Sequence, residues 1–349
     1  MEKKKLNILA AIPLSVGVIN GGVRTQSRET MAFVEKMDGV SVQRFHPWEP
    51  TDLSQADIVH IFLAGPETSA LAHHAANSSA KLVVSPVFYS RHSPGKLKTL
   101  LKGEQMARPL LTGYSSEYRV KADILRRADL ILPNTSAEKE LLMDAFELPD
   151  ERLQVIPNGV NMHFADADAA PFIDATGLKN FTLFVGDLSA RRKNVAALLR
   201  AYTPDNPPLV LIGRLDESDT ANACRTLIEA LPNAHYLGEY SPDDPMLASA
   251  YAAAAVFVLP SLFETPGIAA MEAALAGCAI AITAEGGTRD VFGNDAHYLD
   301  PADPPSMLAA IRQAHKAGPN ATLKNRIATT FSWQQVAEQT VDAYQSLYG

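Results

Sequence analysis

Short apolar runs alternate with longer helix-like segments along the whole chain of 349 residues. The runs are rich in Val, Ile and Leu, which is typical of strands that helices cover on both faces of a sheet. They span residues 6–10, 40–45, 58–62, 82–86, 130–133, 154–156, 181–185, 209–212, 234–237, 256–259 and 279–283. Strands that alternate with helices indicate parallel sheets built from βαβ units. We therefore predict an α/β fold.

The alternating pattern runs twice, with a weak break near residues 157–176, where a Pro-Asn-Gly turn precedes an acidic run of small residues. The length also suggests two domains, because one domain usually holds roughly 100–200 residues. We predict an N-terminal Rossmann-like domain over 1–165 and a C-terminal one over 172–331. The last segment, 332–349, has an apolar helical stripe, and it either ends the second domain or crosses back to the first.

Composition argues against several classes of protein. A net charge of −8 disfavours nucleic acid as the main partner, because phosphate backbones need a basic surface. Two cysteines form neither a disulfide framework nor a thiolate metal site on their own, which favours a cytoplasmic setting. The charged, then apolar, N-terminus favours a buried first strand over a signal peptide. The rest of the sequence has no stretch of about 18 apolar residues, so we predict no membrane-spanning segment.

A basic island interrupts this acidic chain. Residues 86–127 hold nine basic residues and three acidic ones, although the whole chain carries 31 basic and 39 acidic residues. Within the island, segment 93–109 has Leu97, Leu100 and Leu101 at helical spacing among lysines. Two interpretations stay open: a short interfacial helix that touches anionic lipid, or a mobile loop with a solvated basic face.

The junctions between strands and helices are the candidate sites, because ligands bind at the carboxyl ends of the strands in open parallel sheets. At the first junction, Gly21 and Gly22 leave backbone N–H groups free at a helix start, which favours a bound anion. This loop is not the GxGxxG dinucleotide fingerprint. A flexible turn is the alternative.

A second junction carries three consecutive cations. Arg191, Arg192 and Lys193 follow Gly186 and precede a helix that begins near Asn194. The dipole of a helix repels cations at its N-terminus, so this cluster is unfavourable by itself. A bound diphosphate would offset the repulsion, and a solvated basic loop is the alternative.

A third junction places two glutamates eight residues apart. Glu264 lies in a loop after an apolar run, and Glu272 lies in the Ala-rich helix that follows. A carboxylate on such a helix is costly if buried without a partner, and sugar or ribose hydroxyls are suitable partners. Thr265, Gly267 and Ile268 form the helix start, whose N–H groups suit a phosphate. The alternatives are a helix-capping Glu264 and a solvent-facing Glu272.

A fourth junction gathers an aromatic ring, hydroxyl groups and a cation in the first half of the chain. Tyr89, Arg91 and His92 follow the apolar run 82–86, and His92 is a candidate base or ligand. Ordinary surface residues are the alternative. The sequence contains no HExxH, CxxC, GxSxG or GxxxxGK[ST] motif, and we expect no metal site.

Taken together, these junctions resemble the retaining GT-B glycosyltransferases of family 4, the group 1 glycosyltransferases. The segment PSLFETPGIAAMEAALAGCAIAIT carries the E-x7-E element of that family in Glu264 and Glu272, and VGDLSARRKN resembles its phosphate loop. ADLILPNTSAEKELL, VIPNGVNMHF, EGGTRDVFGNDAHYLDP and the final FSW segment also match. The resemblance covers residues 120–349 well and residues 1–120 weakly.

The resemblance implies two Rossmann-like, doubly wound domains that face a central cleft, with the C-terminal helix crossing back to the first domain. It implies transfer of a hexosyl unit from a nucleotide-diphosphate sugar to a glycan, lipid-linked or small-molecule acceptor, with retention and without a metal or other cofactor. Lys193 and Arg192 would neutralise the diphosphate, Glu264 would bind donor-sugar hydroxyls, and Glu272 would bind the ribose. Closure of the domains would exclude water from the donor.

The same resemblance implies a role in cell-surface polysaccharide or glycoconjugate synthesis, with the first domain on the acceptor side and Tyr89, Arg91 and His92 as candidate acceptor residues. The cysteine content favours the cytoplasm, and the basic segment 93–109 leaves peripheral contact at the inner membrane face as one of its two interpretations. Two departures matter. Asp187 stands where many members have Arg, and Pro86-Val87-Phe88 stands where many have a His. A degenerate nucleotide-sugar-binding protein is therefore an alternative, as is a sugar phosphorylase or disaccharide synthase on the same fold.

Overall fold

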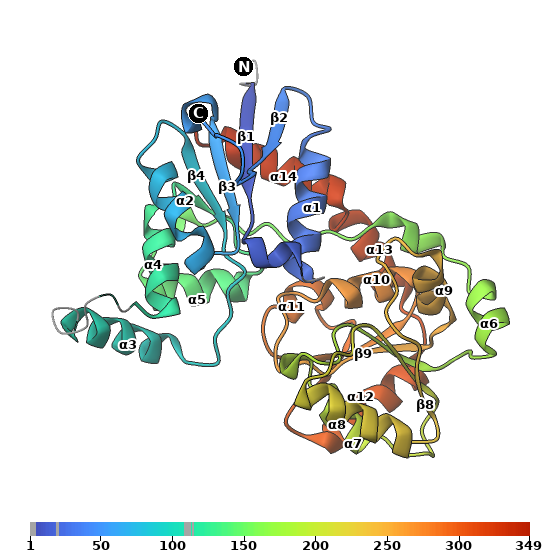
Figure 1. The fold of residues 1–349 in the computed structure, drawn as a ribbon. Helices are drawn as coiled ribbons and strands as arrows, with labels where there is room; N and C mark the ends of the chain where they lie inside the picture. The colour runs from blue at the N-terminus through green and yellow to red at the C-terminus, as the bar shows by residue number, and fades with distance from the viewer. Residues whose placement is uncertain (1–4, 19–20, 108–112, 114) are drawn as a thin grey trace. The chain divides into compact units, whose positions relative to one another are not determined.

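The computed structural model describes residues 5–18, 21–107, 113 and 115–349, and these form two compact units. The first unit contains the chain up to Gly159 together with Trp333–Gly349, and the second contains Val160–Ser332. Each unit is an α/β structure with its own parallel sheet (Figure 1). No helix in the described part of the chain combines the length and the hydrophobicity that crossing a bilayer requires.

A five-stranded parallel sheet lies at the centre of the first unit, as far as the described residues show, with the strand order β2-β1-β3-β4-β5. The strands are β1 (Leu6–Ala11), β2 (Val40–Arg44), β3 (Ile58–Phe62), β4 (Lys81–Ser85) and β5 (Leu130–Ile131). In register, Leu9 pairs with Val59, and Val59 pairs with Leu82. Every residue of β3 is buried, as an apolar run covered on both faces predicts.

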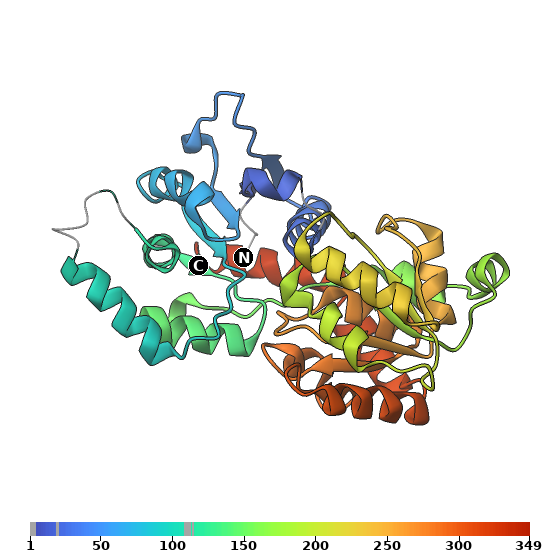
Figure 2. The same cartoon turned by 60° about the horizontal axis from the view of Figure 1, so that its bottom comes forward.

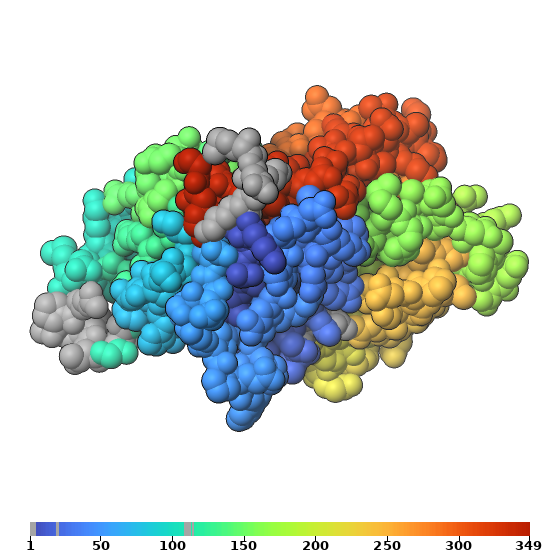
Figure 3. Space-filling view, turned by 90° about the horizontal axis from the view of Figure 1, so that it is seen from above, coloured from blue at the N-terminus to red at the C-terminus, as the bar shows by residue number. Residues whose placement is uncertain are grey.

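Helices flank this sheet on both faces, and the last helix of the chain is one of them (Figure 2). They are η1 (Leu14–Gly17), α1 (Gly22–Val34), η2 (Leu53–Gln55), α2 (Pro66–Ala76), α3 (Pro94–Ala107), α4 (Glu117–Arg127), α5 (Ser136–Phe146), η3 (Asp150–Arg152) and α14 (Trp333–Gln345). Trp333 and Tyr344 of α14 are buried in one core cluster with Leu6 of β1. The C-terminal helix therefore belongs to the first unit, and Figure 3 shows the last residues, in dark red, beside blue to green segments of that unit.

A six-stranded parallel sheet forms the second unit, with the order β11-β10-β9-β6-β7-β8 among the described residues. The strands are β6 (Thr182–Val185), β7 (Leu209–Ile212), β8 (Ala234–Tyr236), β9 (Val256–Leu259), β10 (Ala279–Thr283) and β11 (His297–Leu299). The helices are η4 (Met162–Asp166), α6 (Ala170–Thr176), η5 (Arg191–Lys193), α7 (Val195–Ala201), α8 (Asp219–Ala230), α9 (Pro245–Ala253), α10 (Ile268–Ala276), α11 (Thr288–Phe292), α12 (Pro304–Ala317) and α13 (Ala321–Thr330).

The structure places the expected break of residues 157–176 mostly inside the second unit. The two units meet along the chain at Gly159 and Val160, so residues 160–165 belong to the second unit rather than to the first. Phe164 and Phe172 are 1% and 0% exposed in the core of that unit. These two aromatic side chains anchor a segment whose acidic composition alone is typical of a linker.

One expected strand is absent from the described residues, and one strand was not predicted. Residues 154–156 run beside β5, where Gln154 N–H donates to the carbonyl of Ile131 at 3.0 Å, but they form no strand. Ile156 N–H donates to the carbonyl of Pro133 at 2.9 Å, but proline has no N–H to return, and the pairing amounts to one isolated bridge between Ile131 and Leu153. The short β11 pairs with β10 at the edge of the sheet, and three residues are too few for a clear apolar run.

Candidate functional site

Three residues from two predicted junctions meet at the carboxyl ends of β6 and β9, which are neighbours in the sheet. Lys193 Nζ lies 2.8 Å from Glu264 Oε1, and Arg192 Nη1 lies 3.0 Å from the same oxygen. The side chains of Glu264 and Lys193 are only 6% and 16% exposed, and that of Arg192 is 40% exposed. The structure thus brings Arg192, Lys193 and Glu264 into one ion-pair cluster.

Burial and charge oppose each other in this cluster. Burial by itself raises the pKa of Glu264, but Lys193 and Arg192 reverse the effect and hold the pKa below its ordinary value. Burial lowers the pKa of Lys193, which Glu264 counteracts and Arg192 reinforces. The cluster therefore keeps a buried carboxylate ionised by placing two cations on it.

Backbone and side-chain hydrogen bonds fix the loops that carry the cluster. Leu262 N–H donates to the carbonyl of Arg192 at 2.8 Å, which joins the loop after β9 to the loop after β6. Arg192 Nη1 donates to the carbonyl of Phe263 at 3.0 Å. Asn194 Nδ2 donates to the carbonyls of Pro260 and Pro301, at 3.1 and 2.9 Å. Asn194 thus ties together the loops that follow β6, β9 and β11.

Two close backbone crossings support these loops, and the sequence argument did not identify them. A Cβ at Gly213 would lie 1.9 Å from the carbonyl oxygen of Gly186, and Gly213 has a φ of +137°. A Cβ at Gly286 would lie 2.2 Å from the carbonyl oxygen of Glu264. Both positions require glycine. The sequence signal that could have identified Gly213 is its position directly after the apolar run 209–212.

The helix that follows Glu264 begins at Ile268, slightly later than expected. Gly267 is its N-cap residue, with a φ of +97°, and Thr265 lies in the partly buried turn before it. The first N–H groups of a helix have no carbonyl partner within it, so this end of α10 offers donors to an anion. The start of one helix therefore contains three of the residues predicted to bind the donor, Thr265, Gly267 and Ile268.

Glu272 lies on α10 and faces a buried tyrosine of α9. Tyr251 donates its hydroxyl to Glu272 Oε2 at 3.0 Å, and Tyr251 is 0% exposed. Burial raises the pKa of Glu272 to about 7, against the hydrogen bond from Tyr251, which lowers it. No ion pair within the described residues neutralises Glu272, in contrast to Glu264. Its carboxylate is suited to additional hydroxyl partners.

Asp187, the departure noted in the phosphate loop, has a local structural role. Its Oδ1 accepts a hydrogen bond from Ser189 N–H at 2.9 Å, which forms a turn before the cations. Asp187 also raises the pKa of Lys193, as a negative charge nearby must. Segment 187–193 holds three cations (Arg191, Arg192 and Lys193) and one carboxylate, and Glu264 brings a second carboxylate to it, so one net positive charge remains for an anion.

The remaining predicted residues lie in the first unit. Gly21 and Gly22 cap and begin α1, and a Cβ at either position would meet no atom within 4 Å. Their neighbours Ile19 and Asn20, part of the same predicted loop, lie outside the described residues. Close packing therefore does not explain the two glycines.

Tyr89, Arg91 and His92 lie on the loop between β4 and α3, which a buried glutamate anchors. Glu138 is 2% exposed, and its two oxygens accept hydrogen bonds from Phe88 N–H at 2.6 Å and Asn134 N–H at 2.8 Å. Burial raises the pKa of Glu138 to about 7. The sequence argument missed this residue, although it sits directly behind the predicted acceptor loop.

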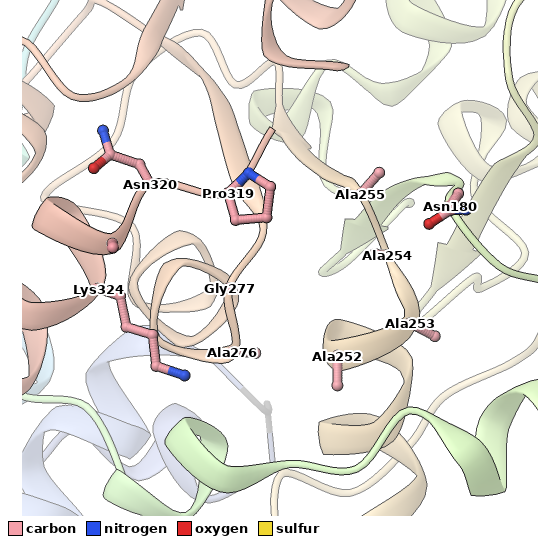
Figure 4. Close-up of a pocket in the computed structure, with 11 residues that line it drawn as sticks. Asn180, Ala252, Ala253, Ala254, Ala255, Ala276, Gly277, Pro319, Asn320 and Lys324 are labelled. Carbon is pink, nitrogen blue, oxygen red and sulfur yellow. The ribbon is translucent and has the colours of Figure 1, made fainter. Parts of the chain in front are cut away.

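A cavity in the second unit lies away from these residues. It has a volume of about 450 Å³ and is lined mainly by small side chains (Figure 4). Asn180, Ala255 and Gly277 contribute to its wall, and each precedes a strand. The cavity is therefore at the amino ends of the strands, whereas α/β sheets bind ligands at the carboxyl ends. Separately, the described residues contain no group of three or more His, Cys, Asp or Glu side chains arranged to hold a metal.

Two family models match this chain. The model for "Glycosyl transferases group 1" matches residues 179–316, which lie in the second unit. The model for "Glycosyltransferase Family 4" matches residues 42–164, most of which lie in the first. The predicted cluster of Arg192, Lys193 and Glu264 falls within the first of these matches.

Similar proteins and structures agree with the family models. An MMP alpha-(1->4)-mannosyltransferase of Mycolicibacterium hassiacum is 26% identical over 68% of this chain and 59% of its own length. The chain spans 57–62% of three other curated relatives. A sucrose-phosphate synthase of Thermosynechococcus elongatus has a TM-score of 0.74 at 20% identity, with 98% and 99% of the two chains covered. HepE of Anabaena, solved with UDP-glucose, has a TM-score of 0.70 at 17% identity, with 98% and 100% covered. These neighbours show that the chain has a two-domain, Rossmann-like GT-B fold.

Proposed function

The chain belongs to the group 1, family 4 glycosyltransferases, and we propose that it transfers a hexosyl unit from a nucleotide-diphosphate sugar to an acceptor. The observation that carries the proposal is the cluster of Arg192, Lys193 and Glu264 at the carboxyl ends of β6 and β9. Two cations at this position match the negative charge that a diphosphate leaving group develops. A similar structure, HepE, was solved with UDP-glucose, which supports a nucleotide-sugar donor.

Each residue of the site has a role in this proposal. Lys193 and Arg192 neutralise the departing diphosphate, and the N–H groups of Gly267 and Ile268 contact its oxygens. Glu264 then accepts hydrogen bonds from the donor-sugar hydroxyls, and Glu272 accepts them from the ribose. The cations supply the charge neutralisation that a metal supplies in other transferases, so the proposed reaction uses no metal or other cofactor.

The finer features follow from the same family. We propose that the anomeric configuration is retained and that the acceptor is a glycan, a lipid-linked sugar or a small molecule bound beside Tyr89, Arg91 and His92. Synthesis of cell-surface polysaccharides or glycoconjugates in the cytoplasm is the corresponding biological role. The mannosyltransferase relative supports a sugar acceptor of this kind.

A donor screen tests the proposal. The purified chain is mixed with UDP-, GDP- and ADP-sugars and with candidate acceptors, and mass spectrometry follows donor loss and product gain. We expect one donor class to bind and to be consumed, and NMR of the product to show the retained configuration. A folded chain that binds no nucleotide sugar would overturn the proposal, and tight binding without turnover would favour the nucleotide-sugar-binding alternative.

The Lys193→Ala variant connects the screen to the site. We expect it to fold and to lose donor turnover, because the diphosphate then lacks its most buried cation. Lys324→Ala is the matched control, since Lys324 lies in the same unit but lines the cavity at the amino ends of the strands. Equal losses in the two variants would show that the cluster has no special role.

A further inference from the structure

A second cationic site lies in the first unit, between α3, α4 and α5, which lie on the same flank in Figures 1 and 2. A cavity of about 320 Å³ opens among these helices. We call it the basic pocket, and its polar lining consists of Lys98, Lys102, Gln105, Arg119, Arg126 and Glu147. Four of the nine cations of the basic island noted in the sequence therefore line one concave site.

Charge in the basic pocket is strongly one-sided. Four of its lining residues are cations, and Glu147 is the one carboxylate among them. Glu147 Oε1 lies 3.9 Å from Lys98 Nζ, and its side chain is 59% exposed, so it offsets little of the charge. Like charges that line one cavity repel one another, and an anion bound between them removes that repulsion.

The arginines of the pocket are held in place by neutral groups. Arg119 Nη2 donates to the carbonyl of Leu101 at 3.1 Å and to Gln105 Oε1 at 2.7 Å. Arg126 Nη2 donates to the carbonyl of Phe146 at 3.4 Å. These bonds orient the guanidinium groups without cancelling their charge. The pocket thus presents fixed donors, and a guanidinium matches the geometry of phosphate oxygens.

A helix-capping role explains only part of the cluster. Lys98 and Arg126 lie near the C-terminal end of α5, where the helix dipole favours cations. Arg119 lies in the first turn of α4, where the dipole disfavours a cation, and Lys102 lies within α3. These two positions need another reason to be basic.

We propose that the basic pocket binds a phosphate-bearing group, either a free phosphate ester or the headgroup of an anionic lipid. The cavity has the volume of a small-molecule site, which suits a phosphate with a sugar or glycerol attached. Leu97 and Leu101 are 0% and 6% exposed in the core of the unit, while Leu100 of the same helix is 46% exposed. Because two of its leucines pack into the core, α3 forms a fixed wall of the pocket. The site uses none of the donor residues, so it stands apart from sugar transfer.

A matched pair of charge reversals tests the pocket with inorganic phosphate. Lys102→Glu changes a lining residue, and Lys96→Glu makes the same change at an exposed position of α3 outside the lining. Calorimetric titration at fixed ionic strength should show about tenfold weaker phosphate binding for Lys102→Glu than for Lys96→Glu. Any phosphate binding that stays unchanged in every variant is assigned to the cations of the second unit. Equal affinities in both variants would overturn the proposal.

Vesicles distinguish the two sources of phosphate. Binding to phosphatidylglycerol vesicles, but not to phosphatidylcholine vesicles, with a selective loss in Lys102→Glu, would assign the pocket to a lipid headgroup. Selective loss of inorganic phosphate binding without vesicle binding would assign it to a free phosphate ester. Arg126→Gln and Arg127→Gln provide a second pair, since Arg127 is exposed and lies outside the lining. Equal losses across this pair as well would show a general basic surface and reject the pocket.

Discussion

Two buried glutamates, one in each unit, have the same chemistry and nearly the same burial but opposite pKa shifts. Glu264 is 4% exposed and Glu138 is 2% exposed. Burial raises the pKa of a carboxyl in both places, yet Lys193 and Arg192 hold the pKa of Glu264 below its ordinary value. Within the described residues, the carboxylate of Glu138 accepts hydrogen bonds from two backbone N–H groups and pairs with no cation, and its pKa rises to about 7. The difference shows that the partners of a buried carboxylate, and not its burial, decide its charge.

The largest effect we expect comes from the cations beside Glu264. Lys193→Ala should lower donor turnover by roughly 100- to 1,000-fold, because removal of one preorganised charge from a transition state has about that cost. Steady-state kinetics with the donor found in the screen measure this effect. The Lys324→Ala control should stay within about twofold of the wild-type chain. A Lys193→Ala enzyme that retains more than a tenth of the activity would remove Lys193 from the mechanism.

Replacement of Glu264 tests the glutamate whose pKa is lowered by two neighbouring cations. Glu264→Gln should destabilise the chain by about 3 kcal/mol near neutral pH, because it leaves Lys193 buried without its carboxylate. The gap should shrink as the pH falls below the ordinary value of 4.5, since the lowered pKa gives stability that is present above that value and lost in acid. Denaturant unfolding between pH 3 and pH 8 measures both effects. A gap that does not change with pH would contradict the lowered pKa.

Replacement of Glu138 tests the glutamate whose pKa is raised. The stability difference between this variant and the wild type should depend on pH with the opposite sign. The folded pKa of about 7 lies above the ordinary value of 4.5, so wild-type stability falls as the pH rises through this window. Glu138→Gln cannot ionise and escapes that loss, so its stability relative to the wild type should improve by about 3 kcal/mol from pH 4.5 to 7.5. Its amide oxygen serves one of the two N–H groups, which lowers its stability at every pH. Parallel curves for variant and wild type would refute the raised pKa.

Glu272 has a neutral hydroxyl as its partner, and the smallest change in stability that we expect comes from removing that hydroxyl. Tyr251→Phe should cost about 1 kcal/mol, because it removes one hydrogen bond in a buried setting. It should also raise the pKa of Glu272 further above 7, since the Tyr251 hydroxyl lowers that pKa. Carboxyl-carbon NMR titration and denaturant unfolding measure the two effects. An unchanged pKa would mean that the hydroxyl has no influence on Glu272.

Most of the fold could be predicted from the sequence, because buried parallel strands appear as uninterrupted apolar runs. The apolar runs at 58–62 and 256–259 are strands with these same bounds in the structure. Failures came where tertiary contacts decide. Phe164 and Phe172 draw an acidic segment into the second unit. Segment 93–109 is helical over Pro94–Ala107, as one of its two interpretations predicted, but Leu97 packs into the core of the first unit.

The candidate site was predictable to the extent that it follows a local motif. Glu264 and Lys193 belong to segments that resemble a family, and the structure places them 2.8 Å apart. Glu138 lies three residues after Thr135, a spacing that predicts a helix cap. The cap forms, since Glu138 N–H donates to Thr135 Oγ1 at 3.1 Å, but the carboxylate accepts from Asn134 N–H and from Phe88 N–H, 50 residues earlier in the chain. No local pattern predicts such a partner.

The hydrogen bonds of Asn194 have a thermodynamic consequence for ligand binding. One amide group donates hydrogen bonds to the carbonyls of Pro260 and Pro301, so it links the loops that follow three different strands. The chain gives up the conformational entropy of these loops when it folds, before any ligand is present. A ligand that binds there meets an ordered surface and does not have to immobilise it, and more of its contact energy remains as affinity.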